Sequence, residues 1–293
     1  MKVLIKFFSL AFLGCSLLYL FSGVVFAAMP RQKDLFTVLV VGFDESPSNT
    51  DVLCVISCDA REKSVKAIQI PRDTYFDYGD KKGKINGLYS YEILKGATKE
   101  EALSTLSIKI SDSLGIGIDG FIAFTSDGLI EAVDWLGGVE ISSENISDQL
   151  KNEYNFGDKD TVSLDGKDSM NFVRYRKGYR RGDLERLDAQ KIFLKAFFEK
   201  IKNTRDPFSF LKVLSQSEGV LFNADKGALV SFALGNRKSF NNLTFQIVTL
   251  PGKAIKTDGS WYYVVNKKEA EALVREYFPE KHGAFDSKKY YIC

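Results

Sequence analysis

Phe36-Thr-Val-Leu-Val-Val-Gly42 is a continuous, largely apolar run that ends in glycine. A strand covered on both faces carries such a run, whereas a strand with one face in water alternates apolar and polar residues. Two further runs, 51–57 and 64–70, flank the turn-like segment 59–63, which is the pattern of a β-hairpin. The sequence therefore predicts three early strands, the first of them covered on both faces.

Helices and strands alternate in the rest of the chain. Thr98-Lys-Glu-Glu101 is a capping box, which predicts a helix that runs to about Leu114 and stops at Gly115. Ser126 is expected to cap the next helix. Further strands are expected at 120–124, 139–141, 243–250 and 261–265, and further helices at 184–203, after Pro207, at 225–234 and at 267–278. No linker-like stretch divides residues 34–280, so we expect one α/β domain with helices on both faces of a mixed sheet.

The amino terminus has the pattern of a membrane-targeting segment. Lys2 and Lys6 precede an uncharged, mostly apolar stretch that reaches roughly 33 Å as a helix, enough to cross a bilayer. Basic residues before the span keep the amino terminus in the cytoplasm. The expected organisation is a cytoplasmic segment 1–6, a transmembrane signal-anchor 7–28, a linker 29–33, an extracellular domain 34–280 and a polar tail 281–293.

Two alternatives exist for this segment. Val25-Phe26-Ala27 resembles a small-residue cleavage site, which would make the stretch a signal peptide. The stretch is longer than the apolar core of a usual signal peptide, and a retained anchor is the preferred interpretation. Phe12-Leu13-Gly14-Cys15 resembles a lipid-attachment box, but apolar sequence continues well past Cys15, which argues against lipidation.

Composition narrows the chemistry. The chain has 40 basic and 38 acidic residues, so without Lys2 and Lys6 the charges balance, which argues against general nucleic-acid binding. The one histidine, His282, rules out histidine triads and histidine-rich zinc sites. Cys54 and Cys58 would lie about 13 Å apart on one strand, too far for a disulfide with each other, and are expected to be small buried hydrophobes.

The segment Asn171–Arg186 concentrates positive charge. Guanidinium groups match phosphate oxygens bidentately, so an anionic ligand is expected. Arg174 and Arg176 would share a face of an extended segment, and the backbone is therefore expected to leave any helix before about residue 174. Arg186 and Gln190 are four residues apart and share a helical face. The other cations of the segment, Lys177, Arg180 and Arg181, are expected to be solvated.

Two aspartates flank the connection between the first two strands. Asp44 follows the first strand and Asp51 opens the second, so the two carboxylates should converge at one edge of the sheet. Mg²⁺ is commonly held by one or two carboxylates together with substrate phosphates. The alternative is that both are turn residues that bind local backbone amides. Nearby, Arg72 emerges at the end of the third strand behind Pro71.

The order of these motifs resembles that of the LytR-CpsA-Psr family. The motifs are GxD at 42–44, TD at 50–51, IPRDT at 70–74, KIN at 84–86, DWLGGVE at 134–140, LDGKDSMNFVRYR at 164–176 and GDLER at 182–186, followed by Gln190. The resemblance covers roughly residues 34–280. The combination of IPRDT, LGGVE and the paired arginines in one order makes it highly specific.

The resemblance implies a membrane-anchored phosphotransferase on the outer face of a Gram-positive-type envelope. Such proteins move a glycopolymer, for example teichoic acid or capsular polysaccharide, from an undecaprenyl-pyrophosphate carrier to a peptidoglycan hydroxyl. The implied fold is an α/β/α sandwich with an apolar tunnel for the polyprenyl chain. Phe193, Phe197 and Phe198 either border that tunnel or, as we prefer, belong to the core.

Site roles follow from the same resemblance. Mg²⁺ would be held by Asp44 and Asp51. Catalysis would depend on Arg72, Asp73, Arg174 and Arg176. Lys84, Arg186 and Gln190 would bind the substrate. Asp73 either orients Arg72, which we prefer, or deprotonates the acceptor.

This chain departs from the family pattern at three positions. The family commonly has arginine where this chain has Asn49, threonine where it has Val52, and often a further arginine where it has Ala189. The missing cations favour one alternative, a catalytically weak polyprenyl-phosphate-binding protein with a regulatory or scaffolding role. A nucleic-acid binder is the third hypothesis and rests on the arginine run alone.

Overall fold

The computed structural model describes residues 35–44, 48–144, 146–157, 159–177, 179, 183–204, 207–224, 242–279 and 286. None of the helices in this part of the chain is long and apolar enough to cross a membrane. The expected anchor 7–28, the linker 29–33, the expected helix at 225–234 and His282 lie outside the described residues.

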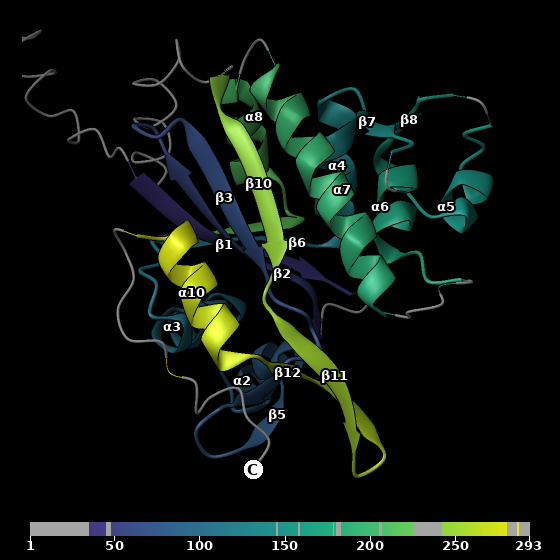
Figure 1. Ribbon diagram of the computed structural model, residues 1–293. Helices are drawn as coiled ribbons and strands as arrows, with labels where there is room; N and C mark the ends of the chain where they lie inside the picture. Colours follow the sequence, from purple (N-terminus) through teal and green to yellow (C-terminus); the bar gives the residue numbers. More distant parts are fainter. Residues whose placement is uncertain are drawn as a thin grey trace, which may run out of the picture.

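A six-stranded mixed sheet forms the centre of the molecule (Figure 1). Its strands, in spatial order, are β10 (Thr244–Thr249), β3 (Ser64–Gln69), β2 (Thr50–Asp59), β1 (Leu35–Phe43), β6 (Gly120–Phe124) and β9 (Val220–Phe222). β1 pairs antiparallel with β2 and parallel with β6, while β3 pairs parallel with β10. The expectation of a mixed sheet that begins with a buried strand and a hairpin is confirmed.

Helices cover both faces of this sheet (Figure 1). One face packs against α2 (Leu88–Leu94), α3 (Lys99–Leu114) and α10 (Lys267–Tyr277). The other face is covered by α7 (Asp183–Lys202) and α8 (Pro207–Gln216), with α4 (Ser126–Trp135) and α6 (Gly166–Arg174) alongside. Because β1 is covered on both sides, Leu39 and Val41 are fully buried toward the first layer and Val38 is 6% exposed toward the second.

Smaller elements extend this sandwich. A hairpin of β7 (Val139–Ser142) and β8 (Thr161–Leu164) lies beside α7, with α5 (Asp148–Glu153) between its strands in sequence. β4 (Tyr75–Asp77) and β5 (Lys82–Lys84) form a second ribbon that leads through η1 (Ile85–Gly87) into α2. A third ribbon, β11 (Gly252–Thr257) and β12 (Ser260–Val265), projects beyond the sheet (Figure 1).

The local signals for helix ends are partly confirmed. Thr98 and Glu101 form the expected capping box, and Gly115 ends α3 with φ 66°, in the left-handed region that favours glycine. The expected cap at Ser126 is wrong by one residue. Thr125 is extended and its side chain accepts from the Gly128 N–H, so Ser126 is already helical. Cys54 and Cys58 are free thiols, as expected.

Candidate functional site

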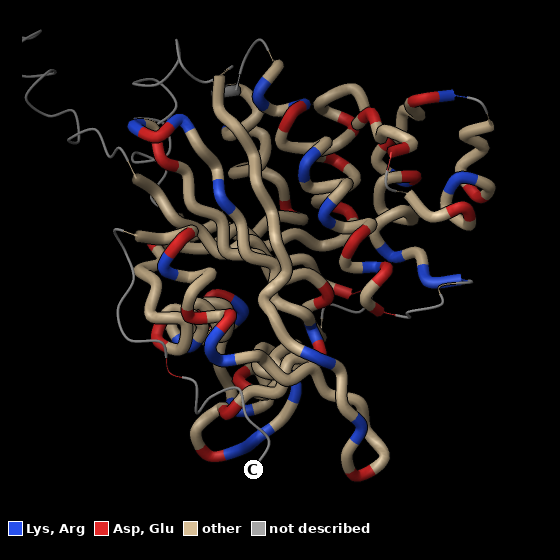
Figure 2. Tube along the Cα trace, in the orientation of Figure 1, with Lys and Arg blue, Asp and Glu red and all other residues tan. Residues whose placement is uncertain are grey.

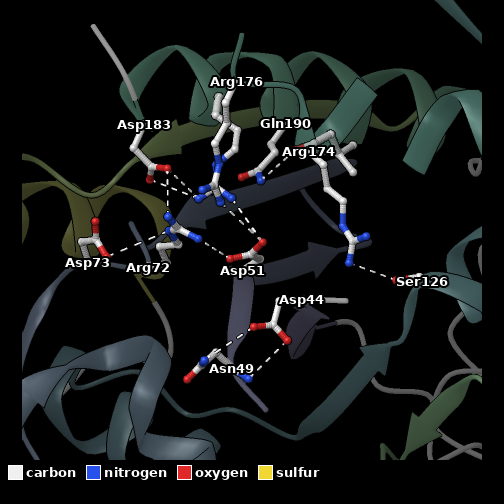
Figure 3. Close-up of polar contacts among 12 residues, drawn as sticks. Asp44, Asn49, Asp51, Arg72, Asp73, Ser126, Arg174, Arg176, Asp183 and Gln190 are labelled. Carbon is white, nitrogen blue, oxygen red and sulfur yellow. Dashed lines mark hydrogen bonds and ion pairs between the residues drawn. The ribbon is translucent and has the colours of Figure 1, made fainter. Parts of the chain in front are cut away.

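One edge of the sheet collects polar side chains from separate elements (Figure 3). Asp44 follows β1 and its N–H donates to the Asn49 carbonyl at 3.1 Å, which closes the connection to β2 and brings Asp51 to the same edge. Arg72 and Asp73 follow β3. The amino-terminal half of α7 passes over this edge and contributes Asp183, Arg186 and Gln190.

Asp51 is the centre of a guanidinium cluster, by which we mean Arg72, Arg176 and Arg186. Its Oδ1 accepts from Arg72 Nη1 at 2.6 Å, and its Oδ2 lies 3.3 Å from Arg186 Nη1 and 3.8 Å from Arg176 Nη2. Burial by itself raises the pKa of Asp51, but the charge of Arg186, the hydrogen bond from Arg72 and the charges of Arg72 and Arg176 together outweigh burial and lower that pKa. Asp51 is therefore an ionised carboxylate that holds three cations together.

Arg186 is the most constrained member of the cluster. Its side chain is fully buried, and within the described residues its Nε and Nη1 have no hydrogen-bond acceptor. A buried cation is normally paired and fully hydrogen-bonded, because an unsatisfied donor in the interior carries the full cost of its lost hydration. These unused donors are what an anion-binding site requires.

Asp183 links two of the arginines. Its carboxylate lies 2.9 Å from Arg186 Nη2 and 3.6 Å from Arg72 Nη2. Burial lowers the pKa of Arg72, but Asp183, Asp51 and Asp73 raise it above its ordinary value. Arg176 differs: burial and the neighbouring charges of Arg186 and Arg72 lower its pKa, although Asp51 and Asp183 partly oppose them. An anion bound at the cluster would offset this repulsion between Arg176 and its neighbouring guanidinium groups.

Asp73 and Lys84 form a second contact group beside the cluster. Lys84 Nζ lies 3.1 Å from Asp73 Oδ1, and Arg72 Nε lies 4.0 Å from the same oxygen. A carboxylate that contacts two cations in this way fixes their positions, which agrees with the preferred orienting role of Asp73.

Arg174 does not join the cluster, contrary to the expectation of a paired clamp. The helix α6 continues through Arg174, and the extended residue is Tyr175, with φ −56° and ψ 135°. The expected exit from the helix before residue 174 is therefore wrong. Arg174 Nη2 instead donates to Ser126 Oγ at 3.0 Å and points away from Asp51 (Figure 3). Val173 and Phe172 at the end of α6 are buried, and this apolar packing prolongs the helix.

Gln190 lies between the cluster and an apolar cavity. It is 2% exposed, accepts from Gln69 Nε2 at 3.0 Å and donates to the Val173 carbonyl at 3.2 Å. The cavity, of about 270 Å³, lies between the sheet and helices α7 and α8. Gly42, Val52 and Gln190 are among the residues that line the cavity, and apart from Gln190 the described lining is apolar.

The three phenylalanines of α7 line this cavity as well as packing in it. Phe193 stacks on Phe197 at 5.7 Å, and Phe198 stacks on Phe245 of β10 at 4.9 Å. The preferred interpretation, that these phenylalanines belong only to the core, is therefore only partly right, because all three side chains also line the cavity.

The donor set suits magnesium only when a substrate contributes ligands. Within the described residues no group of three or more histidine, cysteine or acidic side chains could hold a metal. Asp44 and Asp51 supply hard oxygens from adjacent chain segments, which is the small carboxylate set that Mg²⁺ uses with substrate phosphates. The Asp51 oxygens contact arginines, so an anion that takes over those arginines would release the carboxylate for a metal.

The charges at the site also indicate that a metal ion would enter together with the substrate. Among the described residues, four cations, Arg72, Lys84, Arg176 and Arg186, lie with three carboxylates that they contact, Asp51, Asp73 and Asp183, and with Asp44 at the same edge. Within this described set the charges balance (Figure 2 shows the mixed signs along the chain). A diphosphate diester would leave it negative unless a divalent cation entered with it.

The two missing family arginines have different surroundings. Asn49 reaches the Asp44 carboxylate through its N–H and its side-chain amide, each at 3.5 Å, and Ser90 Oγ donates to its Oδ1 at 3.4 Å. Ala189 is 2% exposed and packs in the apolar cluster with Phe172 and Phe193. Asn49 therefore borders the site, whereas the Ala189 side chain is part of the core. Lys177 is exposed, as expected, while Arg180 and Arg181 lie outside the described residues.

Two further residues contact this site, Asp183 and Gln69. Asp183 occupies the first turn of α7, three residues before Arg186, and that i,i+3 spacing was a usable signal. Gln69 sits at the end of a strand pattern, and its pairing with Gln190 depends on the packing of α7 over the sheet.

The sequence is similar to a known protein family and to several known proteins. The model of the LytR_cpsA_psr family matches residues 22–278. A polyisoprenyl-teichoic acid–peptidoglycan teichoic acid transferase, TagU of Oceanobacillus iheyensis, is 28% identical over 256 residues, covering 84% of this chain and 76% of TagU. The cell wall biosynthesis protein LcpA of Corynebacterium glutamicum is 29% identical over 242 residues, covering 74% of this chain and 46% of LcpA.

Solved structures share the fold. The structure of TagT bound to LIIa-WTA superimposes with a TM-score of 0.66 at 21% identity, covering 84% of this chain and 92% of that one. Bacillus subtilis TagV gives a TM-score of 0.64 at 22% identity, covering 85% of this chain and 99% of TagV. At this level of identity the likeness establishes the mixed α/β architecture.

Proposed function

The chain belongs to the LytR_cpsA_psr family, and we propose that it is a phosphotransferase that attaches a glycopolymer to peptidoglycan. The donor is a glycan linked through a diphosphate to a polyprenyl carrier of the undecaprenyl type. One observation supports this best: the guanidinium cluster, whose fully buried Arg186 has donors without a hydrogen-bond acceptor among the described residues, lies next to an apolar cavity, with Gln190 between them. The cavity suits the polyprenyl chain, and the cluster suits the diphosphate.

The reaction replaces the phosphoanhydride bond of the donor with a phosphoester bond to the acceptor. A peptidoglycan hydroxyl oxygen forms a bond to the phosphorus that carries the glycan, and the bond from that phosphorus to the bridging oxygen breaks. The products are a glycan–phosphate–peptidoglycan diester and polyprenyl monophosphate, and the hydroxyl proton passes to solvent. Phosphoryl transfer needs mainly positioning and neutralisation of oxygen charge, which arginines supply without a histidine.

Each residue has a role in this scheme that its contacts support. Arg186 and Arg72 bind diphosphate oxygens from the buried side, and Arg176, whose side chain is 49% exposed, closes over them. Asp73 holds Lys84 and Arg72 in position. Arg174 fixes α6 against the start of α4 through Ser126, which is a positioning role.

Magnesium belongs to this proposal. Asp44 and Asp51 would hold Mg²⁺ together with diphosphate oxygens, and the ion would supply further neutralisation of the transferred phosphoryl group. The charge balance among the described site residues supports this requirement, since the donor brings negative charge that the arginines alone do not balance.

The expected anchor 7–28 completes the proposal. A single-pass protein with residues 34–280 on the extracellular face would meet both the lipid-linked donor and the wall. The polyprenyl chain would then enter the cavity from the membrane side.

Release of polyprenyl monophosphate tests the function. The full-length chain in detergent is incubated with a polyprenyl-diphosphate-linked glycan, Mg²⁺ and peptidoglycan fragments, and the lipid product is measured by mass spectrometry. Wild-type protein and Arg275→Ala, an arginine on exposed α10 paired with Glu271, should release it equally, whereas Arg72→Ala should lose at least tenfold. Donor binding without release would favour the regulatory or scaffolding alternative.

A further inference from the structure

The ribbon β11–β12 projects from the edge of the sheet that carries the candidate site (Figure 1). Its root is fixed there: the Tyr263 N–H donates to the Asp73 carbonyl at 2.8 Å, and Thr74 and Tyr263 form a parallel bridge. Its tip is a tight turn in which Asp258 and Gly259 both have positive φ, 49° and 78°. The ribbon is therefore a defined arm that begins beside Asp73.

Aromatic and basic side chains cover this arm. The Trp261 residue is 55% exposed and lies directly across the ribbon from Lys256, so the two side chains share one face. Tyr262 lies on the other face, with its ring 6.0 Å from Tyr75 and 5.9 Å from Lys84 Nζ. A two-stranded ribbon alone is at best marginally stable and normally packs against a further layer. Toward its root Tyr263 and Val265 are buried, whereas toward its tip Lys256, Ser260 and Trp261 are exposed.

The order of residues along the site indicates from which side the acceptor approaches. β3 ends at Gln69, which contacts Gln190 beside the cavity; Arg72 in the guanidinium cluster comes next, and then Asp73 at the root of the arm. A donor whose tail lies in the cavity and whose diphosphate lies in the cluster has its leaving oxygen on the cavity side. In phosphoryl transfer the attacking and leaving oxygens are roughly in line, so the acceptor approaches from the side of the arm.

We propose that the β11–β12 arm binds the acceptor, a peptidoglycan saccharide strand, and guides its hydroxyl toward the cluster. This inference rests on the proposed function. The apolar C–H face of a pyranose ring packs on the indole of Trp261, and an aromatic ring offers this contact area at a low cost in side-chain entropy. Lys256, on the same face as Trp261, complements the carboxylates of the strand's peptide stems, and the one acid at the tip is Asp258.

Acceptor kinetics separate this role from donor binding. In the full-length chain, Trp261→Ala should raise the acceptor KM roughly tenfold and leave kcat within about twofold, because the contact is lost equally in the ground and transition states. Affinity for inorganic pyrophosphate should stay unchanged. Trp261→Phe should restore most of the loss. The matched control is Trp135→Ala, which removes the chain's other tryptophan from α4, where it packs on Phe210.

A binding measurement keeps the inference independent of turnover. In Trp135→Phe protein, Trp261 is the remaining tryptophan, and its fluorescence should respond to soluble, uncross-linked peptidoglycan strands and not to free N-acetylated disaccharide at the same sugar concentration. Strand binding without any transfer would support the arm and refute the proposed function. Transfer with the same acceptor KM in wild type, Trp261→Ala and Lys256→Ala would refute the arm and leave the proposed function standing.

Discussion

Asp51→Asn should lower the free energy of unfolding of the protein and raise its affinity for a free anion. In the wild type, the Asp51 carboxylate is the internal counter-ion of Arg72, Arg176 and Arg186. Asparagine keeps the shape of the side chain but removes the charge. Three guanidinium groups at the sheet edge then lack their shared partner, and an added anion can take its place.

The size of the effect follows from the contacts. The Asp51 side chain is 13% exposed, so its pairs lie between the surface and buried limits. A charged hydrogen bond contributes about 1.5–3 kcal/mol, and breaking a buried pair costs about 3–5 kcal/mol. We expect a loss of about 3 kcal/mol in the free energy of unfolding and, without Mg²⁺, a pyrophosphate affinity at least tenfold tighter than that of the wild type.

Urea unfolding and isothermal titration calorimetry measure the two quantities on the same protein. The matched control is Asp188→Asn, on the outer side of α7, where the carboxylate is 42% exposed and pairs with Lys191 at 2.9 Å. Its stability should change by less than about 1 kcal/mol. An Asp51→Asn protein with wild-type stability and wild-type pyrophosphate affinity would refute the description of Asp51 as the internal anion of the cluster.

Three further predictions concern the same edge and the cavity. Because the pKa of Asp51 is lowered from 3.8, the contribution of Asp51 to stability is complete above that pH and is lost as the pH falls through the lower folded-state value. Urea unfolding from about pH 5 to 2 should therefore show a loss of stability in the wild type and a smaller loss in Asp51→Asn. Identical losses in the two proteins would contradict this role of Asp51. Val40→Trp fills the cavity and should weaken polyprenyl-diphosphate binding at least tenfold without changing inorganic pyrophosphate binding. The control Leu94→Trp, at an 86% exposed position, should change the binding of neither ligand. Equal losses of affinity for both ligands in Val40→Trp would argue against a lipid cavity. Arg174→Ala should reduce pyrophosphate affinity less than Arg176→Ala in the same calorimetric assay, since Arg174 binds Ser126; the reverse order would place Arg174 in the cluster.

The elements of the fold were largely readable from the sequence because their signals are local. The run 36–42 lies in β1, which is buried in the sheet, and the box at Thr98 caps α3. The strand order was not readable. The parallel pairing of β10 with β3 joins residues about 180 positions apart, and no local pattern specifies such a partner.

The site shows the same division. Asp44, Asp51 and Arg72 were expected at one edge because each stands at a strand end, and the structure places them together. The backbone at Arg174 differs from the expectation because spacing along the chain cannot show that the packing of Phe172 and Val173 prolongs α6 through Arg174. Asp183 was missed because an acidic residue in the first turn of a helix is ordinary from the sequence alone. Its importance comes from two arginines that tertiary structure brings to it.

The most direct test of the account is the mass of the acceptor after reaction. Soluble peptidoglycan strands are recovered after incubation with the full-length chain, Mg²⁺ and a polyprenyl-diphosphate-linked glycan, and are analysed by mass spectrometry. The account predicts a mass increase equal to one glycan phosphate per modified hydroxyl, dependent on Mg²⁺ and on Arg72. Tightly bound donor with unmodified strands would contradict it.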